Sequence, residues 1–129
     1  MKHFELWVAE LPGVKDSVLK SGHRRVVIAS DCDRESILGS AVPLTKDRSS
    51  LQLPTHVLLC SRYLDHPSRA LCEQILTLDK SHLIRRIGYV EDSFDRFALN
   101  RALALHLNLP FMQGIYFTED NLYETSWSL

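Results

Sequence analysis

Short apolar runs alternate with polar segments between residues 4 and 90, a pattern that favours strands. In FELWVAEL (4–11), Phe4, Leu6 and Val8 occupy every second position, which is the period of a strand with two different faces. Later apolar runs, several of them rich in β-branched residues, are separated by polar stretches with turn residues. Pro43 lies inside one run and indicates an edge strand or a bulge there. The predicted strands are 4–11, 25–30, 37–45, 55–60, 69–76 and 84–90.

The period changes after residue 92, where apolar residues recur at helical spacing. Asp92 and Ser93 are natural N-cap residues, and Pro110 is expected to stop the helix. A helix is therefore predicted from Ser93 to about Asn108, and the residues whose spacing indicates it are Phe94, Phe97, Ala98, Ala102 and Leu105.

These elements predict a mainly β fold with a C-terminal helix: a small, mostly antiparallel β-barrel or curled sheet. A length of 129 residues is appropriate for one domain. We expect that domain to span residues 1–109, followed by a C-terminal extension over residues 110–129.

Composition excludes several classes of protein. No apolar run approaches the roughly 20 residues that a membrane helix needs, and the N-terminal MKHFELW has no signal-peptide pattern. The cysteines, Cys32, Cys60 and Cys72, form no CxxC pair and lie in or beside apolar segments, which favours free, buried thiols in a reducing cytoplasm. Neither the cysteines nor the histidines have the spacing of a metal site, so we expect no metal and no cofactor.

Charge is divided unevenly along the chain. The net charge is −1, but residues 110–129 hold Glu119, Asp120 and Glu124 and no Lys or Arg, so the first 109 residues carry a net charge of +2. The extension also carries spaced aromatic residues. It is expected either to pack on the surface as an extension, or to dock on the basic body and compete with an anionic ligand.

Arg24 and Arg25 open a strand in SGHRRVVIAS (21–30). The residues alone leave two interpretations open: solvated charges at a strand end, or guanidinium groups that bind phosphate oxygens in pairs.

Several segments, taken in order, resemble the MazF/PemK (Kid) family of toxin endoribonucleases, the mRNA interferases of type II toxin–antitoxin systems. The resemblance covers residues 4 to about 108. The segments that carry it are FELW (4–7), GHRR (22–25), PLT (43–45), LPTHVLL (53–59) and CEQILTLDKSHLIRRI (72–87).

The resemblance implies an SH3-like barrel that forms a homodimer, binds single-stranded RNA in a groove at the dimer face and pairs with a cognate antitoxin. It further implies metal-free RNA cleavage through the 2′-OH, no cleavage of DNA, no membrane association and a cytoplasmic location. Arg25 stands where the family has proline, and Leu76 where it has arginine. The alternative is therefore a weakened homologue that acts as an RNA- or protein-binding regulator.

By the same resemblance, Arg24, Thr45 and Glu73 are the expected catalytic residues. Arg24 would clamp the phosphate, Thr45 would donate to a phosphate oxygen, and Glu73 would orient Arg24 or act as base. Without the family pattern, Thr45 also fits a strand terminator, and Glu73 fits a surface ion-pair partner.

The expected RNA-binding residues lie in the loops and strands around that site. His23 is also a secondary candidate for the acid or base. Since Glu73 and Gln74 are neighbours on a predicted strand, their side chains are expected on opposite faces. His56 is predicted to be a packed or edge histidine. The RNA-binding set is Lys20, His23, Arg25, Lys46, Arg48 and Gln74.

Overall fold

The structure is a computed structural model and describes residues 1–11, 22–31, 38–46 and 52–111. Most of the predicted strands are present within a residue or two of the expected bounds, and the C-terminal helix matches closely. The strands are β1 (Glu5–Leu11), β2 (Gly22–Ser30), β3 (Leu38–Thr45), β4 (His56–Leu59), β5 (Ser68–Leu71), β6 (Leu76–Asp79) and β7 (Leu83–Tyr89). The helices are the 3₁₀-helices η1 (Cys72–Gln74) and η2 (Lys80–His82) and the α-helix α1 (Ser93–Leu107).

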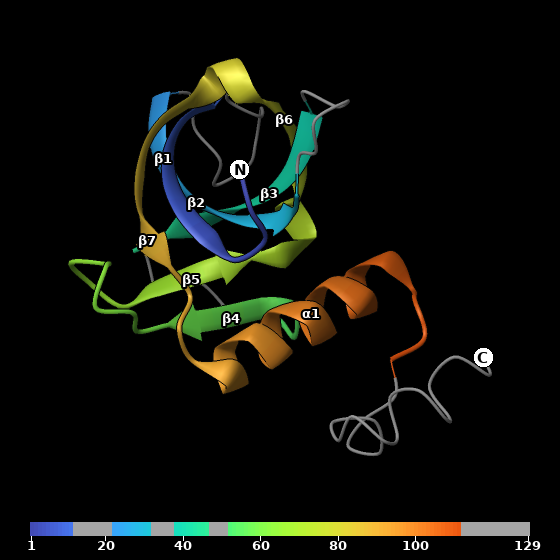
Figure 1. Cartoon of the computed structure of the whole chain (residues 1–129). Coiled ribbons are helices and arrows are strands. Elements are labelled where there is room, and N and C mark those ends of the chain that lie inside the picture. Colours follow the sequence, from blue (N-terminus) through green and yellow to red (C-terminus); the bar gives the residue numbers. More distant parts are fainter. Residues whose placement is uncertain (12–21, 32–37, 47–51, 112–129) are drawn as a thin grey trace, which may run out of the picture.

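The strands form one antiparallel sheet that curls on itself without closing. Its order is β4-β5-β3-β2-β1-β7, and β6 pairs with the first half of β3. Figure 1 shows the curl of β1, β2, β3, β6 and β7, with α1 lying along β4. The prediction of a mainly antiparallel β fold with a C-terminal helix is confirmed.

Pro43 lies in the middle of the sheet, so the prediction of an edge strand was wrong. It pairs with Val26 of β2 on one side. On the other side, Leu38–Ala41 of β3 pair with β6, whereas Leu44 and Thr45 pair with β5. A residue without an N–H is tolerated here because β3 changes partners at this point.

The predicted strand 69–76 is in fact two short strands joined by η1. β5 pairs with the end of β3 and with β4, whereas β6 pairs with the beginning of β3. The chain must therefore turn between them, and the 3₁₀ turn at Cys72–Gln74 makes that turn. Glu73 and Gln74 do not alternate across a strand, so that part of the prediction was also wrong.

Local capping sets the bounds of α1. The Asp92 carboxylate accepts a hydrogen bond from the Phe94 N–H (2.8 Å), as predicted. The helix ends before Pro110, because Asn108 takes the left-handed conformation (φ 57°) and its N–H closes on the Ala104 and Leu105 carbonyls. Of the residues whose spacing indicated the helix, Ala102 is buried, whereas Phe94 is 80% exposed.

Two apolar clusters hold the sheet in place. One joins α1 to the sheet through Leu6, Val42, Leu59, Leu99 and others, and the second fills the curl between β1, β2, β3 and β6. Because β2 and β3 contribute to both clusters, the ends of these two strands are fixed relative to each other. Those ends carry Arg24, Arg25 and Thr45 of the predicted site residues.

Candidate active site

A polar pocket of about 320 Å³ lies where β2 begins and β3 ends. The antiparallel pairing of Val26 with Pro43 brings the first residues of β2 beside the last residues of β3. The pocket collects four predicted residues from β2 and β3 and a fifth from the residue after β3. Its lining is His23, Arg24, Arg25, Leu44, Thr45, Lys46 and Ser68.

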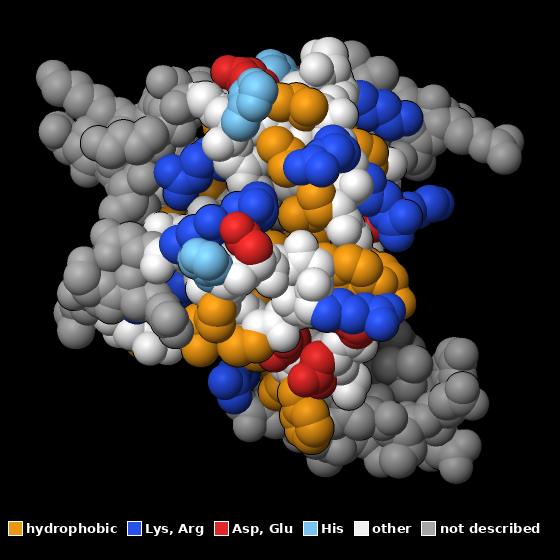
Figure 2. All heavy atoms as spheres, turned by 90° about the vertical axis from the view of Figure 1, so that its left-hand side faces the viewer, with side chains coloured by type: hydrophobic (Ala, Val, Ile, Leu, Met, Phe, Trp, Pro, Cys, Tyr) orange, Lys and Arg blue, Asp and Glu red, His pale blue; other side chains and the backbone are white. Residues whose placement is uncertain are grey.

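Lys and Arg side chains are numerous on the left-hand side of the molecule as seen in Figure 1. Figure 2 shows this face, with hydrophobic groups and some Asp and Glu side chains between the basic ones. A surface on which Lys and Arg outnumber Asp and Glu attracts a polyanion.

Arg24 is anchored by the neighbouring strand. Its Nη2 donates a hydrogen bond to the Leu44 carbonyl at 3.0 Å, next to Thr45. This bond holds the guanidinium at the end of β3, and Arg24 and Thr45 both line the pocket. A guanidinium and a hydroxyl that line one pocket can both donate hydrogen bonds to the oxygens of a single phosphate group.

Arg25 and Lys46 share a carboxylate that the sequence analysis did not identify. Asp65, in the loop between β4 and β5, lies 3.4 Å from Arg25 Nη2 and 3.1 Å from Lys46 Nζ. Within the described part of the chain, the buried Nε of Arg25 finds no hydrogen-bond acceptor. The hydrogen bond from Lys46 is the main cause that lowers the pKa of Asp65, and the positive charge of Arg25 adds to it.

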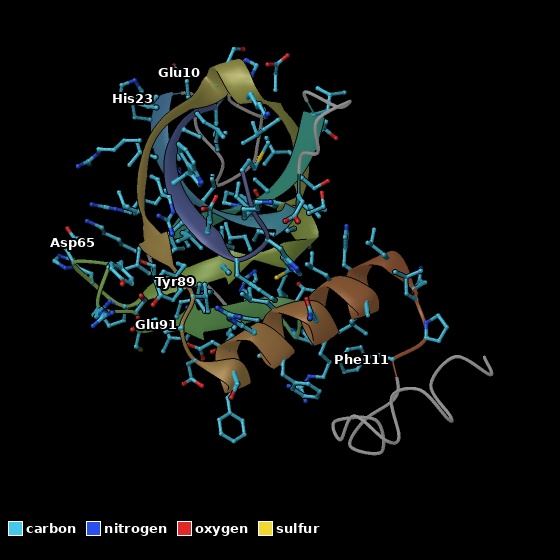
Figure 3. The ribbon with its side chains drawn as sticks, viewed as in Figure 1. Glu10, His23, Asp65, Tyr89, Glu91 and Phe111 are labelled. Atoms are coloured by element: carbon cyan, nitrogen blue, oxygen red, sulfur yellow. The ribbon has the colours of Figure 1, made fainter. Side chains whose placement is uncertain are left out.

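His23 pairs across the hairpin with Glu10, a second residue that sequence reasoning missed. The register of β1 and β2 places Glu10 opposite His23, and His23 Nε2 lies 2.7 Å from the Glu10 carboxylate. Figure 3 shows the two side chains together at one end of the sheet. A carboxylate that holds one imidazole nitrogen fixes the orientation of the ring.

Glu73 belongs to a different hydrogen-bond network. Its carboxylate accepts from Thr55 Oγ1 (2.9 Å) and from His56 Nε2 (3.1 Å). The Leu53 N–H donates to His56 Nδ1, so the proton of the neutral ring is on Nε2. The His56 side chain is only 6% exposed, which confirms the prediction of a packed histidine.

The pKa of Glu73 reflects these partners. Partial burial raises it, but hydrogen bonds from its own backbone N–H, from His56 and from Thr55 outweigh that effect, and the pKa lies below its ordinary value. A carboxylate with a lowered pKa is a poor base at neutral pH. Neither Glu73 nor Gln74, which donates to Glu73 at 3.4 Å, is among the residues that line the pocket.

The remaining predicted groups fall into two sets. Lys20, Arg48 and Cys32 lie outside the described residues. Burial, followed by the charge of Glu73, raises the pKa of the Cys72 thiol to about 12, in keeping with an inert thiol. Cys60 is exposed, contrary to the expectation of buried thiols.

Neither a metal site nor a membrane span is found in the part of the chain that the structure describes. There, no group of three or more His, Cys, Asp or Glu side chains could hold a metal ion. None of the described helices is long and apolar enough to cross a membrane.

Comparison with known proteins gives one family. A family model described as the PemK-like, MazF-like toxin of type II toxin–antitoxin systems matches residues 2–107. Among curated protein sequences, none matches at a significant level.

Solved structures share the fold over most of their length. An endoribonuclease from a mycobacterial species, in complex with its cognate antitoxin, is 24% identical with a TM-score of 0.69, covering 87% of this chain and 99% of that one. The Mycobacterium tuberculosis toxin MazF-mt6 is 21% identical (TM-score 0.63), covering 83% and 99%. MazF in a MazE–MazF structure from Deinococcus radiodurans is 17% identical (TM-score 0.66), covering 85% and 97%.

Proposed function

The chain belongs to the PemK-like, MazF-like toxins of type II toxin–antitoxin systems, and from this premise we propose that it cleaves single-stranded RNA, without a metal ion, in the pocket between β2 and β3. The observation that carries the proposal is the pocket itself. Arg24, Arg25, Lys46 and His23 line it together with Thr45. This set of donors and cations suits a phosphodiester.

The reaction that these groups suit is attack of the RNA 2′-oxygen on the adjacent phosphorus. A base takes the proton of the 2′-OH, the O2′–P bond forms as the P–O5′ bond breaks, and an acid protonates the departing 5′-oxygen, so the products are a 2′,3′-cyclic phosphate and a 5′-hydroxyl. Arg24 and Thr45 would hold the non-bridging oxygens as negative charge develops in the transition state. DNA lacks the nucleophile and would not be cut.

His23 is our candidate for the proton transfer. It lines the pocket beside Arg24, and Glu10 holds its Nε2, which leaves Nδ1 for the substrate. The ring is largely exposed, so a bound RNA can reach it without rearrangement of the core. This role replaces the one first expected for Glu73 as base.

Glu73 would then be a positioning residue. Its hydrogen bonds to Thr55 and His56 tie η1 to the start of β4. His56 in turn pairs with Leu71, the last residue of β5 before η1. Gln74 would reach RNA only at the margin of the groove. Lys20 and Arg48, which lie outside the described residues, remain predicted phosphate contacts.

The proposed partners follow from the family. We propose a cognate antitoxin, a homodimer and a cytoplasmic location. Large apolar side chains that are exposed on and after α1 are consistent with a protein interface: Phe94, Leu105, Leu107 and Leu109 are 49 to 80% exposed. Light scattering at micromolar concentration tests the dimer, and a monomer that still cuts RNA at full rate would contradict it.

The test of the function is an RNA cleavage assay in EDTA, with DNA of the same sequence as the matched substrate. We expect RNA to be cut to fragments with cyclic phosphate ends and DNA to stay intact. Equal cutting of DNA, or activity that returns only with added metal, would contradict the proposal.

Leu76 is the departure from the family pattern that favours the alternative of an RNA-binding regulator. In the structure Leu76 pairs with Ala41 and packs against the second apolar cluster, away from the residues that line the pocket. RNA binding without cleavage, in EDTA and with metal alike, would support the regulator instead.

A further inference from the structure

The loop between β4 and β5 places a carboxylate on two cations of the pocket. The two oxygens of Asp65 are divided between them: Oδ1 lies 3.4 Å from Arg25 and Oδ2 lies 3.1 Å from Lys46. Arg25 comes from β2, and Lys46 follows β3. One anion therefore bridges the two strands at the mouth of the pocket.

This arrangement has the form of a phosphate site. A phosphodiester presents two non-bridging oxygens, just as a carboxylate presents two oxygens. A guanidinium on one side and an ammonium on the other can bind one oxygen each. Arg24 is held separately, by the Leu44 carbonyl. The pocket thus offers one set of donors at Arg24 and Thr45 and a second set at Arg25 and Lys46, enough for two phosphates of one strand.

The Asp65 carboxylate is placed so that it can move away from Arg25 and Lys46. Its side chain is 51% exposed, and an exposed ion pair contributes little to the stability of the fold. The tip of the loop, Asp65, His66 and Pro67, is exposed, whereas Leu64 before it and Ser68 after it are buried. The tip can therefore move between two fixed points without unpacking the core. Figure 3 shows Asp65 at the outer edge of this loop.

We propose that Asp65 occupies the site of an RNA phosphate next to the scissile one, and that RNA binds by displacing this carboxylate from Arg25 and Lys46. The inference rests on the proposed function. In the free protein, Asp65 keeps the two cations paired and positioned. It also lowers the affinity for short or weakly charged ligands, which cannot replace it at both cations.

The test compares Asp65→Asn with Asp79→Asn. Asp79 gives the same change of charge at the other end of β3, where it pairs with Leu38 and caps η2, and asparagine retains that capping. The probe is a single-stranded RNA with every 2′-OH methylated, so that it binds and cannot be cut. Binding is measured over a range of salt concentrations, and thermal unfolding confirms that each variant is folded.

We expect Asp65→Asn to bind about two- to fivefold more tightly than the wild type. Its plot of log K against log salt should be steeper than that of the wild type, because the wild type alone contains a competing ion pair that salt weakens. Asp79→Asn should match the wild type. An equal gain in both variants, or no gain or a loss in Asp65→Asn, would overturn the inference alone. Failure of all three proteins to bind RNA would overturn the proposed function and the inference with it.

Discussion

His56 donates its Nε2 proton to Glu73, and this bond joins the start of β4 to the turn that follows β5. The ring is buried, and its Nδ1 accepts from the Leu53 N–H, so both nitrogens are satisfied in the neutral form. The pair therefore stabilises the corner of the sheet where β4 begins and β5 ends.

Replacement of His56 by alanine should destabilise the fold by about 1–3 kcal/mol, because Glu73 and the Leu53 N–H each lose a partner. His82→Ala, at an exposed histidine of η2, is the matched control and should be close to neutral. Urea unfolding at neutral pH measures both. Equal effects of the two substitutions would show that the His56–Glu73 bond contributes little.

Glu73→Gln should lower the melting temperature at neutral pH and have less effect in acid. The pKa of Glu73 lies below its ordinary value, so its stabilisation is present above the ordinary glutamate pKa of about 4.3 and is lost as the pH falls through the lower folded-state value. Thermal unfolding of both proteins over that range checks this. A gap that widens in acid would contradict the assignment.

Arg24→Ala should reduce RNA cleavage by about 10²-fold or more, which is the usual loss when one preorganised donor to the transition state is removed. Arg25→Ala should cost much less in kcat and act mainly on binding, because Arg25 is proposed to hold the phosphate next to the scissile one. Single-turnover cleavage rates and melting temperatures of both variants decide the matter. Similar losses in kcat would mean that the clamp is wrongly assigned.

The sequence predicted this site in part, because the segments that carry the family resemblance contain Arg24 and Thr45. It could not show that Glu10 and Asp65 complete the site. Glu10 reaches His23 through the register of a hairpin, and Asp65 arrives from a loop that pairs with neither β2 nor β3. Both depend on contacts between segments whose relative placement has no local signal in the sequence.

The errors in the predicted fold have a similar origin. Apolar character alone did not reveal that the segment 69–76 pairs first with the end of β3 and later with its beginning, which requires the turn at Glu73. On α1, the buried side includes Leu99 and Ala102 and leaves Phe94 exposed, because burial depends on how the helix lies against β4 as well as on its own periodicity.

His23→Gln should lower kcat by about 10²- to 10⁴-fold, as expected for loss of a group that transfers the proton. It should lower kcat far more than it weakens the binding of uncleavable RNA, which a purely structural role would not do. Glu10→Gln is the companion variant and should lower kcat less. An unchanged kcat in His23→Gln would exclude this histidine from the chemistry.

The acidic extension gives a prediction that goes beyond the described residues, since residues 112–129 lie outside them. Phe111 is described, and its ring packs against Phe97 of α1 with centroids 5.2 Å apart. If the extension competes with RNA, truncation after Leu109 should strengthen binding of uncleavable RNA at low salt. Unchanged binding by a folded truncated protein would leave the extension as a surface-packed segment.

Gly88 and Tyr63 link the stability of β7 to the loop that carries Asp65. A Cβ at residue 88 would lie 2.1 Å from Tyr63 Cγ, and the backbone there has φ +159°. Gly88→Ala must therefore displace the ring, and we expect a loss of about 1–3 kcal/mol, as for other overpacked sites. In the double variant Gly88→Ala/Tyr63→Ala the clash is absent. Its loss of stability should therefore be smaller than the sum of the losses of the two single variants, with a coupling above about 0.5 kcal/mol in a urea-unfolding cycle.

Because Tyr63 lies two residues before Asp65, Gly88→Ala should also change RNA affinity. Additive losses of stability together with unchanged RNA affinity would show that the loop is not held through this contact.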